Sequence, residues 1–497
     1  MGNVSAASPP HLPADSPTLA PWTSAERESF FDAIARHRRA AWRVTFAGGV
    51  ADAVAALVVA VLMAPLFYAG LALLLDLVNL AVPAPNLVDT IDRWITPAID
   101  TPQTLSLRDW LRLGLVAALP GLLWMLLVLL VLKRAVRLCG MFASGDVAAR
   151  APNVQVLAEQ RFANVVAEMA IAANVPPPRL LVADSGASNA AVFGSDEQHA
   201  TIIASEALLA ALNREQMQGI AAHLVGSIAD GDMTIGMRVA TTVGLFGLIA
   251  KFAGTFDNGP AVRRLVSAFA ATAFRPTPEA ARRFVAELAD PFAPDTPRRE
   301  ARGRDAQQAT RREERNWRRL LWIPLAGPLV ITGFFGGLVS LFLLQPLVSL
   351  AWRQRKYMAD AIAVRLTRDP DALAGALGRM SGTVAGGMFA SWAAHLSVVR
   401  PDGARASANL LATSFVPPFP SMRRRLQALA KLGAQVTVLP HGWPRQLLII
   451  LVPLAALIGV LVCVALYLMT FLSVALSMLF LGLPFAIVHV LLRLVGH

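Results

Sequence analysis

Long uncharged apolar runs constrain the fold of this chain more than any other feature. Residues 447–492 contain no Asp, Glu, Lys or Arg and are long enough for two membrane-spanning helices. Two earlier runs, roughly Ala53–Leu75 and Leu113–Leu132, each supply the roughly 20 apolar residues that a bilayer core requires. A fourth run, Leu320–Trp352, contains prolines and glycines, so we expect a kinked span there. The sequence therefore predicts a multi-pass membrane protein, in agreement with its 55% hydrophobic residues.

The charged residues predict how these spans are oriented. Arg43 precedes the first span and Lys133 and Arg134 follow the second, whereas the connection between the spans is rich in Asp. By the positive-inside rule, the N-terminus and the soluble parts lie on the cytoplasmic side of the inner membrane. No cleavable signal peptide is expected, because residues 1–22 lack an apolar core. The formal net charge of +12 fits such flanks, and no basic and aromatic module predicts a nucleic-acid partner.

Changes in composition suggest how the chain is organised. The expected parts are a disordered tail (1–22), a helix with two transmembrane helices (23–139), a first soluble half (140–236), membrane segments (237–352) flanking an Ala/Arg-rich insert (257–319), a second soluble half (353–440) and a hydrophobic C-terminal region (441–497). The number of crossings between 237 and 352 stays open. The arginines that end the insert are interpreted as a solvated helix face rather than a nucleic-acid site.

The first soluble half contains recognisable secondary structure. Helices are expected at Arg161–Ala173, Glu206–Leu212 and Arg214–Ile228, the last with Asn213 as its N-cap. Short strands are expected at Arg179–Asp184 and Thr201–Ala204. The third of these helices contains the one motif with chemical meaning.

That motif is an incomplete version of His-Glu-x-x-His. In the complete motif both histidines bind zinc from one face of a helix, and the glutamate is the general base for the metal-bound water. Here His223 occupies the first position, Leu224 the position of the glutamate, and Ser227 the position of the second histidine. The two cysteines, Cys139 and Cys463, have neither metal-site nor disulfide spacing.

The residues around this motif resemble the integral-membrane zinc metallopeptidases of the HtpX and CAAX prenyl endopeptidase type. The likeness covers roughly residues 25–432 and is carried by short segments in the family's order: 164–179, 189–192, 212–223 with Asp232, 355–360, 394–396, and 417–418 with 423–426. The resemblance implies a mostly α fold: polytopic membrane helices with a gluzincin-like metallopeptidase domain of small strand content, split by a membrane and insert region. It also implies a third zinc ligand, a glutamate, where this chain has Lys356.

The departures from the family decide the expected chemistry. An aliphatic side chain, a hydroxyl and an ammonium stand at Leu224, Ser227 and Lys356, so no catalytic residue and no cofactor are expected. His223 is interpreted as a neutral core histidine, with residual zinc ligation as the alternative. Lys356 is expected to pair with Asp360 or to take the place of the metal between two helices. His199, His395 and His441 show no metal-like spacing.

These observations predict a membrane-embedded metallopeptidase homologue that is catalytically inactive. It would act by binding membrane or misfolded protein partners in protein quality control, within the lipid bilayer and without nucleic acid. The alternative is an active zinc-dependent membrane endopeptidase with an atypical site. A transport role has the least support, because no span carries a buried charge pair.

Overall fold

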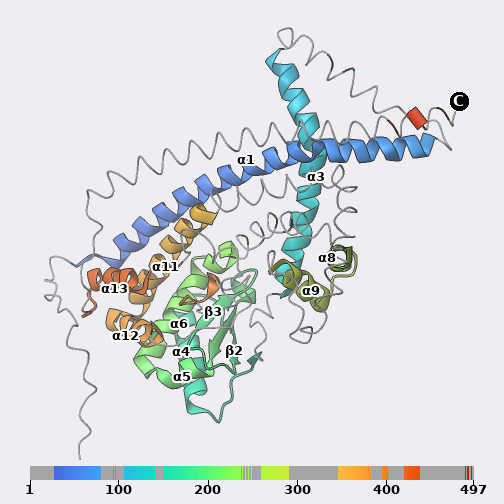
Figure 1. The fold of residues 1–497 in the computed structure, drawn as a ribbon. Coiled ribbons are helices and arrows are strands. Elements are labelled where there is room, and N and C mark those ends of the chain that lie inside the picture. Colours follow the sequence, from blue (N-terminus) through green and yellow to red (C-terminus); the bar gives the residue numbers. More distant parts are fainter. Residues whose placement is uncertain are drawn as a thin grey trace, which may run out of the picture.

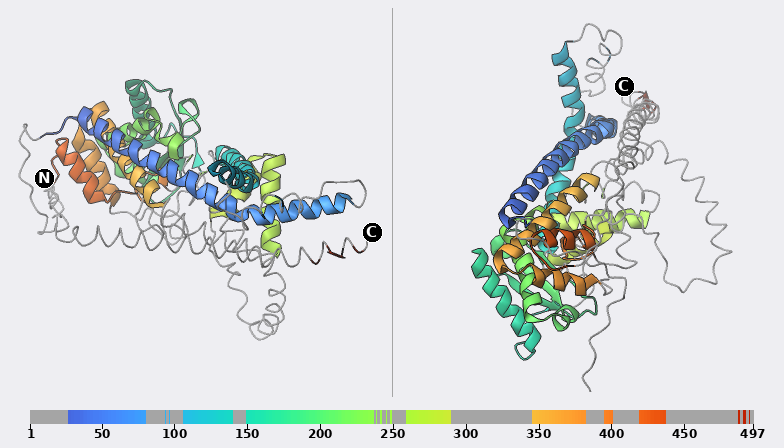
Figure 2. Two further views of the ribbon diagram at one scale, coloured as in Figure 1. Left: turned by 90° about the horizontal axis from the view of Figure 1, so that it is seen from above. Right: turned by 90° about the vertical axis from the view of Figure 1, so that its left-hand side faces the viewer.

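A computed structural model describes residues 27–79, 106–139, 149–236, 259–289, 345–381, 395–400 and 419–436, together with scattered single positions (Figure 1). Two long helices, α1 (Phe30–Asn79) and α3 (Leu107–Cys139), project from a soluble domain that has a small sheet (Figures 1 and 2). The described part of the chain is mostly helical, as the sequence predicts. The expected tail at 1–22 and the uncharged run 447–492, apart from a few single positions, lie outside the described residues.

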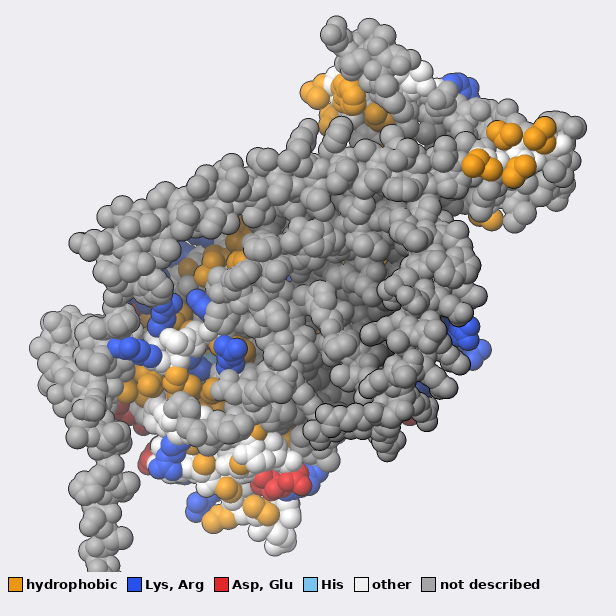
Figure 3. All heavy atoms as spheres, in the orientation of Figure 1, with side chains coloured by type: hydrophobic (Ala, Val, Ile, Leu, Met, Phe, Trp, Pro, Cys, Tyr) orange, Lys and Arg blue, Asp and Glu red, His pale blue; other side chains and the backbone are white. Residues whose placement is uncertain are grey.

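Helices α1 and α3 are both long and apolar enough to cross a membrane. They pack closely where Gly121 meets Ala60, because a Cβ on Gly121 would come within 2.6 Å of the Ala60 backbone. Leu115, Leu119, Leu123 and Leu126 remain exposed on α3, as expected of a face turned toward lipid. Hydrophobic side chains also lie on the surface of the upper projections in Figure 3. The helix expected up to Arg43 and the first span form one continuous helix, α1.

The soluble domain is built on a four-stranded sheet with the order β1-β2-β4-β3. The strands are β1 (Ala149–Arg150), β2 (Arg179–Ala183), β3 (Ala190–Phe193) and β4 (Thr201–Ser205). Strands β2 and β4 are parallel, with Leu181 opposite Ile203, whereas β1 and β3 pair antiparallel with β2 and β4. The strands β2 and β4 agree with the sequence prediction, and β3 forms an edge of the sheet.

Helices of the soluble domain enclose one core. They are α4 (Leu157–Ala173), α5 (Glu206–Ala211), α6 (Arg214–Ala229), α12 (Pro370–Ser381) and α13 (Met422–Lys431), with a 3-10 turn, η4, at Glu197–His199. Asn213 caps α6 as expected, in a capping box with Gln216. The apolar residues of α6 lie in the centre of this core, packed among side chains from α4, α12 and the sheet.

Helix α11 (Gln345–Thr367) connects the membrane helices to the soluble domain. It runs antiparallel to the first half of α1, because Ile34 packs against Ala361 and Ile362, whereas Gly48 lies near Leu347. One helix therefore continues through residues 352 and 353, where the sequence suggests a boundary between a membrane segment and a soluble half.

Part of the predicted insert is folded against a membrane helix. Helices α8 (Gly259–Phe274) and α9 (Pro278–Ala289) bury Leu265 and Phe284 in a cluster that also contains Val128 of α3. The arginine-dense end of the insert at 298–319 and most of the run Leu320–Trp352 lie outside the described residues.

Candidate functional site

Helix α6 presents the incomplete motif to α11. His223 and Ser227 are four residues apart and therefore share one face of α6. The two helices approach closely there, since a Cβ on Gly226 would lie 2.7 Å from a methyl group of Ile362. Leu224 is only 1% exposed and packs in the apolar core.

His223 lies in a buried cluster with an aspartate and an arginine. Its Nδ1 is 2.9 Å from Oδ1 of Asp360, an electrostatic contact without good hydrogen-bond geometry, and its Nε2 has no hydrogen-bond partner among the described residues. Burial lowers the pKa of His223 to about 4, against the opposing effect of Asp360, so the imidazole is neutral at pH 7.

Arg425 of α13 holds the other side of this aspartate. Its Nε and Nη2 donate to the two carboxylate oxygens of Asp360 at 2.8 and 2.6 Å, and its Nη1 donates to the carbonyl oxygen of Val398 at 2.6 Å. Burial alone would raise the pKa of Asp360, but the Arg425 guanidinium holds that pKa well below its ordinary value. The pair is a bidentate ion pair inside the protein.

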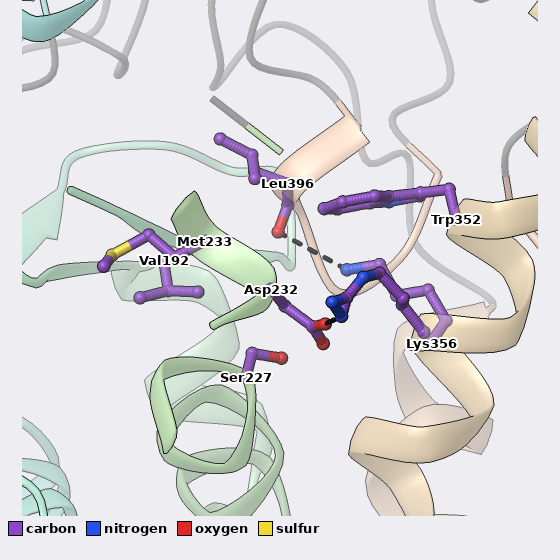
Figure 4. A pocket seen from close by; sticks show the side chains of 8 residues that line it. Val192, Ser227, Asp232, Met233, Trp352, Lys356 and Leu396 are labelled. Atoms are coloured by element: carbon purple, nitrogen blue, oxygen red, sulfur yellow. Dashed lines mark hydrogen bonds and ion pairs between the residues drawn. The ribbon is translucent and has the colours of Figure 1, made fainter. Parts of the chain in front are cut away.

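Ser227, Asp232 and Lys356 line one small cavity. Figure 4 shows Ser227 on α6 and Lys356 on α11 at opposite sides of this cavity, with Asp232 between them. The cavity has space for about one water molecule. His223 and Leu224 do not line it, so the structure brings only two of the four motif positions to this cavity.

Lys356 binds backbone oxygen atoms. Its Nζ donates to the carbonyl oxygen of Ser397 at 2.6 Å and lies 3.4 Å from that of Leu396. The ammonium also lies over the rings of Trp352 and Phe419, at 5.7 and 5.9 Å from their centres. Burial lowers the pKa of Lys356, and the nearby Arg425 lowers it further. The expected pairing with Asp360 is wrong, because among the described residues the amine binds these carbonyl oxygens and forms no ion pair with that carboxylate. Lys356 therefore ties α11 to residues 396–397 rather than to α6.

Arg355, the residue before Lys356, binds the segment that follows α6. Arg355 donates from Nη1 to Asp232 at 2.7 Å and lies 3.6 Å from Asp230. Asp230 also accepts a hydrogen bond from Arg38 of α1 at 2.7 Å. Burial raises the pKa of Asp232, and the Arg355 guanidinium opposes this effect.

Residues 397–399 cover the edge of the sheet that β3 forms. Lys356 binds the same segment, at the carbonyl oxygen of Ser397. Ala191 of β3 pairs antiparallel with Ser397, and the Val398 amide donates to the carbonyl oxygen of Ala190 at 2.8 Å. The Asn189 side chain donates to the Val399 carbonyl at 2.8 Å. An extended polypeptide could add to this part of β3 only after residues 397–399 had moved away.

Comparison with known proteins shows which family this part of the chain resembles. The sequence model of peptidase family M48 matches residues 157–293. The chain is 27% identical over 267 residues to the protease HtpX homolog of Thermoanaerobacter pseudethanolicus, covering 54% of this chain and 71% of that protein. It is 31% identical over 159 residues to the protease HtpX homolog of Streptococcus thermophilus, covering 30% of this chain and 53%, about half, of that protein. Residues 157–293 of this chain are therefore M48-like, and the chain is similar to HtpX homologues. No solved structure matches it.

M48 peptidases depend on zinc, and the donor set of this HtpX-like chain does not fit that metal. Zinc prefers four ligands, of which catalytic sites take three from protein nitrogen, sulfur or carboxylate oxygen. Within the described residues, no group of three His, Cys, Asp or Glu side chains could hold a metal ion. At the ligand positions, Ser227 offers a hydroxyl and the Lys356 amine donates to the Ser397 carbonyl. In this part of the chain, the Nε2 of His223 is a suitable donor atom that lacks a partner.

Sequence reasoning recognises most of these residues but not their partners. Asp232, Asp360 and Arg355 belong to the HtpX-like pattern, yet nothing in the sequence pairs Asp360 with Arg425. Three arginines stand side by side at 423–425, and only the α-helical packing of α13 determines that Arg425 points inward. His395 contacts the wall of the cavity. The indole of Trp352, which lines the cavity, donates to the carbonyl oxygen of His395 at 2.7 Å.

Proposed function

We propose that this protein is a membrane-embedded M48 pseudopeptidase that binds membrane or misfolded protein partners without cutting them. One observation carries the proposal: at two zinc-ligand positions stand a serine and a buried lysine, and the lysine donates to a backbone carbonyl in the fold. The proposed place of action is the inner membrane, with the soluble domain on the cytoplasmic side.

The side-chain chemistry supports inactivity at each step of hydrolysis. Leu224 cannot accept a proton from water, and loss of a general base alone typically costs about 10² to 10⁴ in rate. Without a bound metal, the substrate carbonyl also lacks its Lewis acid. The buried ion pair Arg425–Asp360 joins α13 to α11, and the pair Arg355–Asp232 joins α11 to the segment that follows α6.

A binding role is compatible with the retained fold. The core around α6 is closely packed, and the apolar residues of this helix are buried in it. In the proposed role, a partner segment displaces residues 397–399 from β3 and takes their place as a strand. That exchange uses the backbone of β3 and needs no catalytic group.

The proposal is tested with detergent-purified full-length protein and a fluorescent unfolded polypeptide, such as labelled casein. We expect binding by fluorescence anisotropy, an intact polypeptide after prolonged incubation, and no effect of a zinc chelator. Chelator-sensitive cleavage would overturn the proposal, as would the absence of binding in both detergent and reconstituted membranes.

A complementary variant restores the family motif. Leu224→Glu, Ser227→His and Lys356→Glu together place two imidazoles and two carboxylates at the family's positions. We expect this variant to take up zinc, measured by metal analysis, and the parent chain to take up none. A triple variant that folds but takes up no zinc would contradict the view that the fold persists around a disabled centre.

The second candidate function is an active zinc-dependent endopeptidase with an atypical site. The Nε2 of His223, which has no hydrogen-bond partner in the described segments, favours it, because a carboxylate at the other ring nitrogen is typical of zinc-bound histidines. About one zinc per purified chain, lost in His223→Ala, would establish this candidate and reject the first.

A further inference from the structure

Helices α8 and α9 form a hairpin that rests on α3 with one face. Leu265 and Ala268 of α8, and Ala281, Phe284 and Val285 of α9, are buried in the cluster shared with α3. Their partners on α3 include Met125, Val128 and Leu132, which belong to the second half of that candidate span. Figure 1 shows the hairpin beside the end of α3 that leads into the soluble domain.

The other face of this hairpin is basic. Its arginines are all exposed: Arg263, Arg264, Arg275, Arg282 and Arg283. The residues 259–289 contain five arginines and two glutamates, which gives a formal charge of 5 − 2 = +3. The last turns of α3 add exposed Lys133, Arg134 and Arg137 on the same side of the span.

Large apolar side chains lie exposed on the same hairpin. Phe274, the last residue of α8, is 85% exposed, and Val266 is 49% exposed. Amphipathic helices with a basic face and exposed aromatic residues are typical of elements that lie in the headgroup region of a bilayer. This hairpin packs on the second half of α3, next to the exposed Lys133, Arg134 and Arg137 that end this candidate span, so it is held near the end of the span.

We propose that the α8–α9 hairpin lies on the membrane surface and binds the headgroups of anionic phospholipids. Its arginines contact the headgroup phosphates, and Phe274 inserts at the boundary between headgroups and acyl chains. The packing of the hairpin on α3 and its positive charge both specify the bilayer as the partner. The proposal does not depend on whether the protein is an enzyme.

The test places a reporter at the end of α8 in the full-length protein. Phe274→Cys, in a chain with Cys139→Ser and Cys463→Ser, is labelled with an environment-sensitive fluorophore and reconstituted in nanodiscs. The discs contain phosphatidylcholine alone or mixed with phosphatidylglycerol, and some carry nitroxide lipids labelled close to the headgroup. We expect blue-shifted emission and strong nitroxide quenching with phosphatidylglycerol, and loss of most of this quenching without it.

Two sets of substitutions identify the cause. Arg263→Gln, Arg264→Gln, Arg282→Gln and Arg283→Gln together should abolish the dependence of the quenching on phosphatidylglycerol and on salt concentration. The control set, Arg161→Gln, Arg179→Gln and Arg214→Gln, removes exposed arginines of the soluble domain and should leave both unchanged.

Three results would overturn the proposal. The first is water-like emission in both lipids, and the second is quenching that is independent of phosphatidylglycerol. The third is a blue shift that follows the number of chains per disc rather than the lipid, which would indicate a second copy of this chain as the partner.

Discussion

At the scale of single residues, the ion pair between Asp360 and Arg425 is the most consequential contact in the site. Both side chains are almost fully buried, and the guanidinium engages both oxygens of this one carboxylate. Asp360→Asn leaves an uncompensated buried charge, so we expect a loss of about 3–5 kcal/mol in the free energy of unfolding. Arg214→Gln, which removes an exposed pair with Glu168, should cost about 0–1 kcal/mol. Equal melting temperatures for the two variants would contradict this prediction.

His223 should make stability depend on pH in a defined window. Its pKa is about 4 in the folded protein and 6.5 in the unfolded chain, so the unfolded chain binds more protons between these values. The stabilisation is fully present above pH 6.5 and is lost as pH falls toward 4, by about 3 kcal/mol in total. His223→Gln should flatten this part of the pH profile, measured by melting in detergent. A variant profile parallel to that of the parent chain would show that His223 does not titrate there.

At the scale of elements, the packing of α6 against α12 depends on one glycine. A Cβ at Gly219 would lie 2.8 Å from the backbone N and Cα of Leu373, and backbone atoms cannot move aside cheaply. We expect Gly219→Ala to destabilise the protein by about 1–3 kcal/mol.

A second glycine provides the matched control. Gly378 lies inside α12, and a Cβ added there would meet nothing within 4 Å, so Gly378→Ala should stabilise by about 0.5–1 kcal/mol through helix propensity. Thermal melts of the two variants should shift in opposite directions. A shift in the same direction would mean that the α6–α12 contact is looser than the structure indicates.

Some helices and strands could be predicted from the sequence and one could not. Periodicity and capping residues locate α4, α5, α6, β2 and β4 within a few residues, because these elements are determined by local patterns. The edge strand β3 escapes this reasoning, since Ala190–Phe193 is a short apolar run without alternation.

The site also has a part that the sequence predicts and a part that only the structure shows. The replaced ligand positions Leu224, Ser227 and Lys356 can be read directly from the motif, and the inactivity that they imply stays a prediction. The partners of Lys356 could not be predicted, because they are the backbone carbonyls of residues 396 and 397, far along the chain. Only the tertiary packing of residues 395–399 on β3 brings them within reach.

At the scale of the whole molecule, α1 belongs to two environments. It contains a candidate membrane span, Phe30–Val61, yet its first turns pack against α11 through Ala33 and Ile34. His37 Nδ1 lies 2.7 Å from the side-chain oxygen of Gln354 on α11, two residues from Lys356. The membrane helix and the site therefore share one helix–helix contact, and a disturbance of that contact should reach the site.

This coupling leads to a prediction that separates buried from exposed positions on the same helix. Ile34→Ala removes a side chain packed against Met358, Ala361 and Ile362, so we expect a loss of about 2–5 kcal/mol and faster amide exchange along α11. Phe31→Ala, one turn away, removes a side chain that is 60% exposed and should change stability by about 0.5 kcal/mol or less. Hydrogen exchange in detergent, read by mass spectrometry over residues 345–367, distinguishes the two. If Ile34→Ala left exchange in α11 unchanged, α1 would be a membrane anchor attached to the soluble domain rather than part of its core.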